Sequence, residues 1–418
     1  MRQIVSLSCL SFICLLFPSV LLAQSHGVDL RNALMPASGG MAGTSIAAPQ
    51  DCISAINANA AAMTQYKGTN MILGAAWAEP TVRLNQLTDA PLIGVSPYSA
   101  KSSTPGSLIP SIGVTQEIEG LPLPVTVGLG FVGAAGAGTS FVGVSESNNT
   151  ASYLLLLEVP IAVAVEVTEG LSLGGSMFVG DGFASGPFVG NSKMTNAYSL
   201  RGSVGLNYQV TDDSWLGAYY LSTQEFRFQD QVVLFNQTTP RDVNIGLPQQ
   251  VGIGIANKQL LDGRLLLAAD ALYYDWESAA LFSDIYNSSW AMHLGAQYTT
   301  RRKAQLRCGY AYSGNPIDPT VGTEVSGIPV PGGIPSVNYL QSQFSAQCNH
   351  RIGGGFGMQI YRGIQLDAFA GGMFPATFQF GSSTSTYLAS YWIGFGLTWH
   401  FDHCPETGYQ PPNSTAYL

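Results

Sequence analysis

The segment "YLLLLEVPIAVAVEV", residues 153–167, is the feature that most constrains the fold of this chain. Its odd-numbered positions from Leu155 to Val167 are all aliphatic, whereas its even-numbered positions include Glu158 and Glu166. Side chains of a β-strand alternate between two faces, so the segment predicts a strand with one continuous apolar face. A strand buried on both faces would not carry two carboxylates without partners. The pattern favours the wall of a membrane β-barrel, with the odd face toward lipid and the even face toward the lumen.

The low charge content favours a membrane barrel over a soluble β-sandwich, the alternative that this strand leaves open. Only 10% of the 418 residues are charged, compared with about 25% in an ordinary globular domain. After the N-terminus, no apolar run reaches the roughly 18 residues of a membrane-spanning helix. Alternate residues from Tyr391 to Phe401 are again large and apolar. A final strand of this kind is typical of outer-membrane barrels, with Phe401 in the aromatic girdle.

The N-terminus predicts export. Residues 1–23 have a basic start at Arg2, an apolar stretch and a small residue, Ala23, before Gln24, as in a secretory signal peptide. An exported barrel belongs in the outer membrane of a diderm bacterium. Residues 402–418 are rich in Pro, Asn, Ser and Thr and are interpreted as a periplasmic tail.

The alternating segments predict an all-β fold, a transmembrane antiparallel barrel of about fourteen strands within residues 68–401. We expect strands near 69–78, 108–117, 123–134, 151–167, 171–182, 196–210, 214–228, 243–256, 264–277, 287–300, 304–313, 339–350, 363–380 and 386–401. Short turns fall on one side, and the long loops 79–107, 228–242 and 314–338 fall on the other. Three loop segments are apolar, at 232–236, 279–282 and 327–335, and predict a site for a partner or ligand.

Residues 24–67 differ from the rest, because they are rich in small residues and lack strand alternation. Short helices are predicted within 51–63, and strands begin near Thr69. A compact segment of this kind before a barrel predicts a plug, or hatch, in the lumen.

The run "SGGMAGTSIAAPQDCISAINANAAAMT" resembles the hatch of the outer-membrane long-chain fatty-acid transporter family, the FadL type, whose members also carry aromatic hydrocarbons. The residues that fit the hatch pattern are Gly43, Asp51, Ser54, Asn59 and Ala61, with Ala60 where the family has Pro. Later matches are Leu247, Pro248, Asp270, Trp276, Arg307, Gly309, Tyr310, Tyr312 and Pro316. Together the matches cover residues 27–401.

The resemblance implies uptake of hydrophobic small molecules by passive, ligand-gated diffusion. A ligand would dock on the loops, enter an apolar pocket, and be released by a shift of residues 24–30 in the hatch. It would then leave sideways beside a kinked third strand, here at Gly133, Gly136 and Gly138. The alternative is that these glycines only leave room for the plug. Phe131 and Phe141 flank the glycines and are candidate ligand contacts, although lipid-facing or packing roles fit them equally.

Other functions are less consistent with the sequence. A general diffusion porin would need more lumen charge than 17 Lys+Arg and 26 Asp+Glu provide, and a plug would block it. An outer-membrane lipid hydrolase would need a nucleophile elbow, and the segments 43–47 and 138–142 lack its second Gly. A structural or adhesion barrel is the remaining alternative. We expect no enzyme activity and no cofactor.

The expected partners are a hydrophobic ligand, outer-membrane lipid and, during biogenesis, the barrel-assembly machinery. The net charge of −9 gives no reason to expect nucleic acid. The protein is expected to be a monomer.

Four cysteines remain after signal cleavage, and they allow three disulfide connectivities. We favour Cys308 with Cys348 across neighbouring strands, and Cys52 with Cys404 between hatch and wall; free thiols are the alternative. The spacing of His400, His403 and Cys404 is too weak a signal for a metal site, so no metal is expected.

Overall fold

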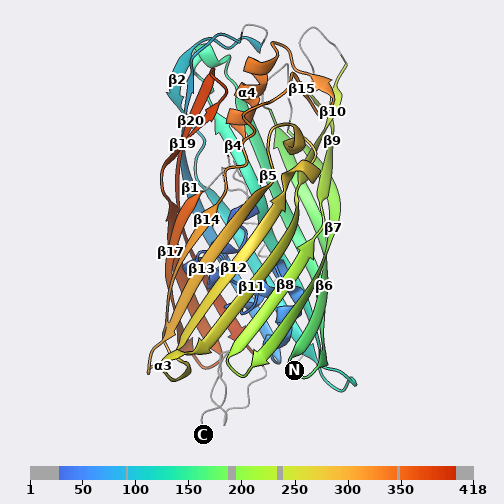
Figure 1. The fold of residues 1–418 in the computed structure, drawn as a ribbon, viewed down its shortest axis with the longest axis vertical. Coiled ribbons are helices and arrows are strands. Elements are labelled where there is room, and N and C mark those ends of the chain that lie inside the picture. The colour runs from blue at the N-terminus through green and yellow to red at the C-terminus, as the bar shows by residue number, and fades with distance from the viewer. Residues whose placement is uncertain (1–27, 91–92, 187–193, 233–238, 346–348, 402–418) are drawn as a thin grey trace, which may run out of the picture.

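The computed structural model describes residues 28–90, 93–186, 194–232, 239–345 and 349–401, so the predicted signal peptide and tail lie outside the described residues. Within this part of the chain, sixteen strands form one antiparallel sheet. β2 (Tyr98–Lys101) extends only β1, β19 (Ala376–Phe380) extends only β20, and the other fourteen strands close into a barrel (Figure 1). The predicted fold class is therefore confirmed. No helix among the described residues is long and apolar enough to cross a membrane.

The barrel wall follows the chain in sequence order. Its strands are β1 (Thr69–Gln86), β3 (Ser107–Ile118), β4 (Val125–Ser140), β5 (Ala151–Thr168), β6 (Leu171–Ser185), β7 (Thr195–Thr211), β8 (Ser214–Leu221), β11 (Gln249–Gln259), β12 (Leu265–Asp275), β13 (Ser289–Thr299), β14 (Gln305–Ser313), β17 (His350–Tyr361), β18 (Ile364–Met373) and β20 (Thr384–His400). Along its whole length β1 pairs with β20, which closes the ring. A closed ring leaves no free sheet edge, so wall strands can satisfy their backbone hydrogen bonds by pairing with neighbours on both sides, as strands in hydrocarbon require.

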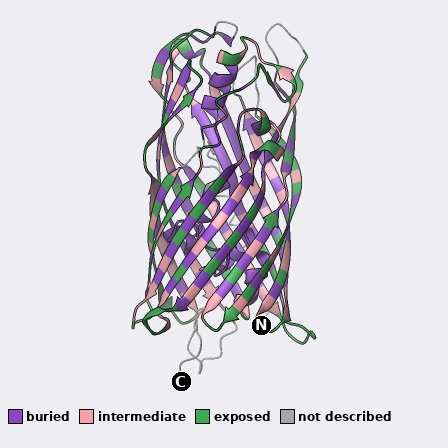
Figure 2. Cartoon of the chain, in the orientation of Figure 1, coloured by how far each residue is buried: buried purple, intermediate pink, exposed green. Residues whose placement is uncertain are grey.

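Residues of the wall alternate between the outside and the lumen (Figure 2). On β5, Ile161 and Val163 are exposed outward, whereas Glu158 and Ala162 are buried in the lumen. On β20 the outward side chains include Phe395, which is 60% exposed. The alternation predicted from residues 155–167 and 391–401 thus matches the two faces of the wall, except at Leu155, which is buried.

The two ends of the barrel differ in the length of their connections (Figure 1). Short hairpin turns, including the four-residue turn α3 (Leu260–Gly263), lie at the lower end in Figure 1. Long loops lie at the other end. They contain β9 (Gln224–Val232), β10 (Arg241–Leu247), β15 (Glu324–Val325), β16 (Ile328–Pro329), α4 (Ile334–Gln343), η6 (Ser145–Ser147), η7 (Trp276–Ser278) and η8 (Phe282–Asp284).

Residues 28–66, which we call the hatch, lie inside the lower half of the barrel (blue in Figure 1) and are almost entirely buried. The elements of the hatch are η1 (Val28–Leu30), η2 (Asn32–Leu34), η3 (Ser38–Met41), α2 (Cys52–Asn57) and η4 (Ala60–Gln65). The short helices predicted within 51–63 are confirmed as α2 and the start of η4.

Lumen-facing glycines of the wall mark where the hatch lies. A Cβ atom added to Gly353 of β17 would be 2.5 Å from the carbonyl oxygen of Gly39. A Cβ atom on Gly174 of β6 would clash with the backbone of Ala61. Because these positions carry no side chain, the hatch backbone lies directly against the wall.

The structure corrects several predicted strands. A strand over 339–350 is wrong, because Tyr339 to Gln343 end helix α4 and β17 begins only at His350. The predicted segments 214–228, 243–256 and 363–380 each contain two strands rather than one. The predicted loop 79–107 is shorter than expected, because β1 continues to Gln86.

Candidate functional site

The hatch is held together by a capping carboxylate. Asp51 precedes α2, and its Oδ1 accepts a hydrogen bond of 2.8 Å from the backbone N–H of Ser54. Its Oδ2 accepts hydrogen bonds from the backbone N–H groups of Ala37 at 2.8 Å and Ser38 at 3.2 Å. A buried carboxylate needs such donors. Asp51 therefore links η3 to α2.

Asn59 plays a similar part at η4. Its side-chain oxygen accepts a hydrogen bond from the N–H of Ala61 at 3.3 Å. Its NH2 group donates to the carbonyl oxygens of Ile46 in the hatch, at 3.0 Å, and Leu206 in the wall, at 2.9 Å. Gly43 has a φ of 91°, which side chains rarely adopt. All the predicted hatch residues lie within the hatch: Gly43, Asp51, Ser54, Asn59, Ala60 and Ala61.

A buried charge cluster joins the start of the hatch to the wall. Glu158 of β5 forms ion pairs with Arg31 of the hatch at 3.0 Å and with Arg201 of β7 at 2.6 Å. Both guanidinium groups also lie over the ring of Phe178, at 4.9 and 5.3 Å from its centroid. Since two buried cations share one carboxylate, the loss of that carboxylate would leave them uncompensated.

Asp270 of β12 provides a second anchor. Its Oδ2 accepts hydrogen bonds from the backbone N–H groups of Ser45 at 2.7 Å and Ile46 at 3.2 Å. These two hydrogen bonds to the carboxyl group fix this hatch loop against the wall.

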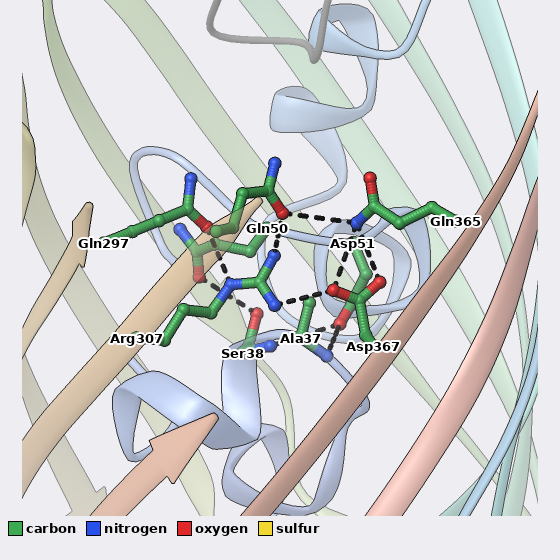
Figure 3. Close-up of polar contacts among 9 residues, drawn as sticks. Ala37, Ser38, Gln50, Asp51, Gln297, Arg307, Gln365 and Asp367 are labelled. Atoms are coloured by element: carbon green, nitrogen blue, oxygen red, sulfur yellow. Dashed lines mark hydrogen bonds and ion pairs between the residues drawn. The ribbon is translucent and has the colours of Figure 1, made fainter. Parts of the chain in front are cut away.

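A third polar cluster surrounds the Asp51 loop (Figure 3). Arg307 of β14 pairs with Asp367 of β18 at 2.6 Å, and its Nε donates to Gln297 at 2.7 Å. Gln365 donates to the second oxygen of Asp367 at 2.8 Å. In Figure 3 these wall side chains point toward the hatch segment that carries Asp51. The cluster therefore lies where the hatch meets β14 and β18.

The hatch leaves little free space against the wall. A cavity beside Arg31, Asp270 and His293 has a volume of about 20 Å³. This is close to the roughly 10–15 Å³ that one water molecule needs. The cavity is therefore too small for a hydrophobic ligand.

A larger cavity, which we call the mouth cavity, lies at the loop end and has a volume of about 80 Å³. Its lining is mostly apolar and includes Val232, Val243, Ile245, Leu281, Ile328, Pro329, Val330, Pro331, Leu340 and Phe344. All three apolar loop segments noted in the sequence contribute to this lining, although residues 233–236 lie outside the described part. An apolar cavity of about 150 Å³ can bind benzene, so a ligand must displace loop side chains to enter.

Helix α4 covers the mouth cavity and is buried from its third residue onward. The Tyr339 hydroxyl lies 2.7 Å from that of Tyr98 and 2.6 Å from Oγ1 of Thr150. Gln341 donates a hydrogen bond of 2.8 Å to the carbonyl oxygen of Ile285. Contacts to several loops thus hold the helix in the barrel mouth.

The wall is interrupted between β3 and β4. β4 pairs with β3 only as far as Val132, and its register with β5 shifts between Gly133 and Ala135. Among the described residues, the next backbone hydrogen bond on the β3 side runs from Ser103 N to Ser140 O, at 2.8 Å. The ladder between β3 and β4 is therefore open from residue 133 to 139. Such bulges bend a strand and interrupt its pairing with the neighbouring strand.

The other predicted site residues have separate surroundings. Gly136 and Gly138 are buried on β4 beyond the bulge and pair with β5. Phe131 is partly exposed, and Phe141 is buried with its ring 5.6 Å from that of Tyr98. Neither phenylalanine lines the mouth cavity.

Sequence reasoning missed the role of the charged wall residues and of α4. Glu158, Arg201 and Asp270 are charged positions on the lumen faces of β5, β7 and β12. In a chain with 10% charged residues, such inward charges are the signal that could have identified the hatch contacts. Asp270 and Arg307 carried the family resemblance, but their partners were not predicted.

The two predicted disulfides and the expected absence of a metal site remain predictions. Cys52 is buried, Cys308 is exposed, and Cys348 and Cys404 lie outside the described residues. Since β17 starts at His350, the strand assignment that placed Cys348 beside Cys308 no longer applies. His400 Nδ1 lies 2.6 Å from Oδ1 of Asn70, and the described residues contain no cluster of three metal-ligating side chains.

The closed wall, the filled lumen and the unequal ends define a class of protein, the plugged β-barrel of the outer-membrane type. Solved structures of this class share the fold. The toluene transporter TodX of Pseudomonas putida has a TM-score of 0.63 and 16% identity, over 88% of this chain and 99% of that chain. A Pseudomonas aeruginosa FadL homologue has a TM-score of 0.63 and 14% identity, over 91% of this chain and 99% of that chain.

The toluene transporter TbuX of Ralstonia pickettii has a TM-score of 0.58 and 18% identity, over 88% of this chain and 99% of that chain. The neighbours are thus FadL-type channels, in agreement with the resemblance seen in the sequence. At these identities the likeness shows a shared fold. No protein-family model and no curated protein matches the sequence.

Proposed function

We propose that this protein is an outer-membrane transporter, not an enzyme, that takes up hydrophobic small molecules by passive, ligand-gated diffusion. A ligand enters the mouth cavity from the loop side, moves into the barrel, and leaves sideways into the membrane. Burial of apolar surface at about 25 cal/mol per Å² drives the first steps. A sideways exit preserves that energy, because the ligand does not cross a wet lumen.

The mouth cavity is the observation that carries the proposal. Its walls come from β9, β10, α4 and the 325–331 loop, and its lining is almost wholly apolar. Binding sites for small hydrophobic ligands have linings of this kind. A water-filled porin would instead present a polar path, whereas here the hatch and α4 occupy the barrel.

Release requires a change in the hatch. The predicted moving segment is 24–30, of which residues 24–27 lie outside the described part. Arg31 follows this segment directly and is held by Glu158 and by Oδ1 of Asn57, at 2.7 Å from the latter. We expect the segment before Arg31 to move while this anchor keeps the rest of the hatch in place.

The β3–β4 interruption is the proposed exit. The bulge at Gly133 lies one residue along the wall from Val132, where pairing with β3 ends. Missing backbone bonds make separation of these two strands less costly than at any continuous ladder. The toluene transporters with the same fold support an aromatic hydrocarbon as ligand, and the sequence resemblance also supports fatty acids.

The test uses the full mature chain in mild detergent and in planar bilayers. Native mass spectrometry of the purified protein should show a bound hydrocarbon or fatty acid, and conductance should be negligible. In proteoliposomes, radiolabelled toluene or oleate should enter faster than in protein-free vesicles. A Val330→Asp variant should slow uptake, because it places a carboxylate in the mouth cavity. Thr323→Asp is the matched control, because Thr323 is exposed on the same loop and does not line the cavity.

A large steady conductance without bound ligand would make the protein a diffusion porin and overturn the proposal. Hydrolysis of a lipid ester by the purified chain would instead revive the enzyme alternative.

A further inference from the structure

The short-turn end of the barrel is divided by charge. Three consecutive turns, between β11 and β12, β13 and β14, and β17 and β18, carry the cations Arg264, Arg301, Arg302, Lys303 and Arg362. Asp262, beside Arg264 at 3.8 Å, is the one acid in these turns. We call this sector the basic rim. All its cations except the half-buried Arg264 are exposed.

The opposite sector of the short-turn end carries negatively charged side chains. The turns after β3, β5 and β7 hold the acids Glu119, Glu169, Asp212 and Asp213, and Glu117 and Glu166 lie near the ends of β3 and β5. Two cations lie beside these acids. Lys67 is 3.3 Å from Glu117 and 3.8 Å from Glu166, and the backbone N–H of Lys258 donates a hydrogen bond of 2.8 Å to the carbonyl oxygen of Asp213. The charges are therefore separated around the rim rather than mixed.

Neighbouring turns of the basic rim are close enough to act together. Strands in a sheet lie about 4.8 Å apart, so successive hairpin turns lie about 10 Å apart around the barrel. This is similar to the Debye length of about 8 Å at physiological salt. An anionic group held at one turn therefore also feels the cations of the next.

Apolar side chains lie directly beside these cations. Tyr361, which precedes Arg362, is 70% exposed, and Ile360 is 51% exposed. Leu260 and Leu261, in the turn before Arg264, are 50% and 54% exposed. A ligand that satisfies both kinds of group needs an anionic head and an apolar body. Basic residues beside a bilayer surface that also carries aromatic anchors have this arrangement.

We propose that the basic rim binds the phosphate headgroups of anionic phospholipids in the leaflet next to the short turns. The proposal rests on the proposed placement of the barrel in an outer membrane. The guanidinium and ammonium groups hold the phosphate, and the neighbouring Tyr361 and leucines contact the acyl chains. The acidic sector repels the same lipids. Anionic lipid therefore collects beside β12–β18 and is excluded beside β3–β8, the sector that contains the β3–β4 interruption.

The test measures lipid retention. The full mature chain is reconstituted with equal amounts of phosphatidylglycerol and phosphatidylethanolamine, released into mild detergent, and analysed by native mass spectrometry at low and high salt. The basic-rim variant Arg301→Gln/Arg302→Gln/Lys303→Gln/Arg362→Gln is compared with the matched acidic-sector variant Glu119→Gln/Glu169→Gln/Asp212→Asn/Asp213→Asn. Heat-modifiability on gels checks that both variants fold.

We expect the wild-type chain and the acidic-sector variant to retain phosphatidylglycerol preferentially, with a preference that falls at high salt. In the basic-rim variant the ratio of retained phosphatidylglycerol to phosphatidylethanolamine should fall by about tenfold or more, because four surface cations are removed. Equal retention by wild type and basic-rim variant, or no preference in the wild type, would overturn the proposal. The proposal would also be overturned if the basic-rim variant lost binding to isolated peptidoglycan in a sedimentation assay while its lipid retention stayed unchanged.

Uptake of radiolabelled toluene or oleate is measured in the same proteoliposomes. Failure of wild-type uptake would count against the proposed function, and the lipid preference would still decide the rim proposal. The two failures are therefore distinguishable.

Discussion

At the scale of single residues, Glu158 is the position where one change should matter most. It is fully buried and pairs with both Arg31 and Arg201. Glu158→Gln removes the charge that compensates two buried cations, so we expect a loss of about 3–5 kcal/mol in stability. The measurement is the midpoint of denaturant unfolding in detergent, followed by heat-modifiability on gels.

Glu166→Gln is the matched control on the same strand. Glu166 is 27% exposed and pairs with Lys67 at 3.8 Å, so its replacement should cost less than about 1 kcal/mol. Equal shifts in the two variants would show that the buried cluster does not contribute to stability as argued.

A second residue-scale prediction concerns the glycines under the hatch. Gly353→Val places a side chain 2.5 Å from Gly39 O, so the hatch must move and we expect a cost of roughly 1–3 kcal/mol. Limited proteolysis with mass spectrometry should then detect new cleavage within residues 28–66. Gly354→Val is the control, because its added Cβ atom meets nothing closer than Arg307 O at 3.8 Å. Cleavage in both variants, or in neither, would contradict a direct hatch contact at Gly353.

The sequence could predict the faces of such residues but not their partners. The two-residue alternation of apolar side chains along the strand predicts that Glu158 lies on the lumen face, because the residues on the other face are aliphatic. Arg31 lies 127 residues earlier in the chain, and no local pattern connects the two. The pairing exists only because the hatch folds back into a closed barrel.

At the scale of elements, the sequence reading failed where the hatch and loops shape the wall. β17 was missed because Gly353, Gly354, Gly355 and Gly357 break its apolar alternation. Gly353 and Gly355 are where η3 lies against the wall. The sequence pattern places the first half of helix α4 in the loop 314–338 and the second half in a strand, although Pro335 in its first turn is a helix-start signal. The other strands were predicted because their outward faces must be apolar in a membrane, whatever the lumen contains.

The β3–β4 interruption leads to an element-scale prediction. A Cβ atom at Gly133 would lie 3.8 Å from Cβ of Ile109, which is close to the mean of about 3.8 Å for disulfides. The variant Ile109→Cys/Gly133→Cys, made with the native mature cysteines replaced by alanine, should form a cross-link that holds the two strands together. After oxidation, uptake of radiolabelled toluene or oleate should be lost while native mass spectrometry still detects bound ligand, and reduction should restore uptake.

Each single-cysteine variant is the control for this experiment, because it cannot form the cross-link. Wild-type uptake by the fully oxidised double variant would show that the ligand does not leave between β3 and β4.

At the scale of the whole molecule, two separate layers close one barrel. The hatch fills the half next to the short turns, and α4 with its loops covers the other end (Figure 1). Neither layer takes part in the hydrogen-bonded ring of wall strands, which closes where β1 pairs with β20 over its full length. A ligand path therefore needs both layers to move, whereas the barrel can remain closed throughout.

This arrangement predicts how conductance should respond to deletions. Removal of residues 28–66 alone should leave a folded barrel with little steady conductance, because α4 still occupies the mouth through Tyr339 and Gln341. Replacement of 326–343 by a short Gly-Ser turn should likewise leave the hatch closed. The two changes together should give a large, steady ion conductance in planar bilayers, because no remaining layer blocks the lumen. Heat-modifiability confirms that each barrel folds. If the hatch deletion alone opens a steady pore, α4 does not seal the mouth, and gating depends on the hatch alone.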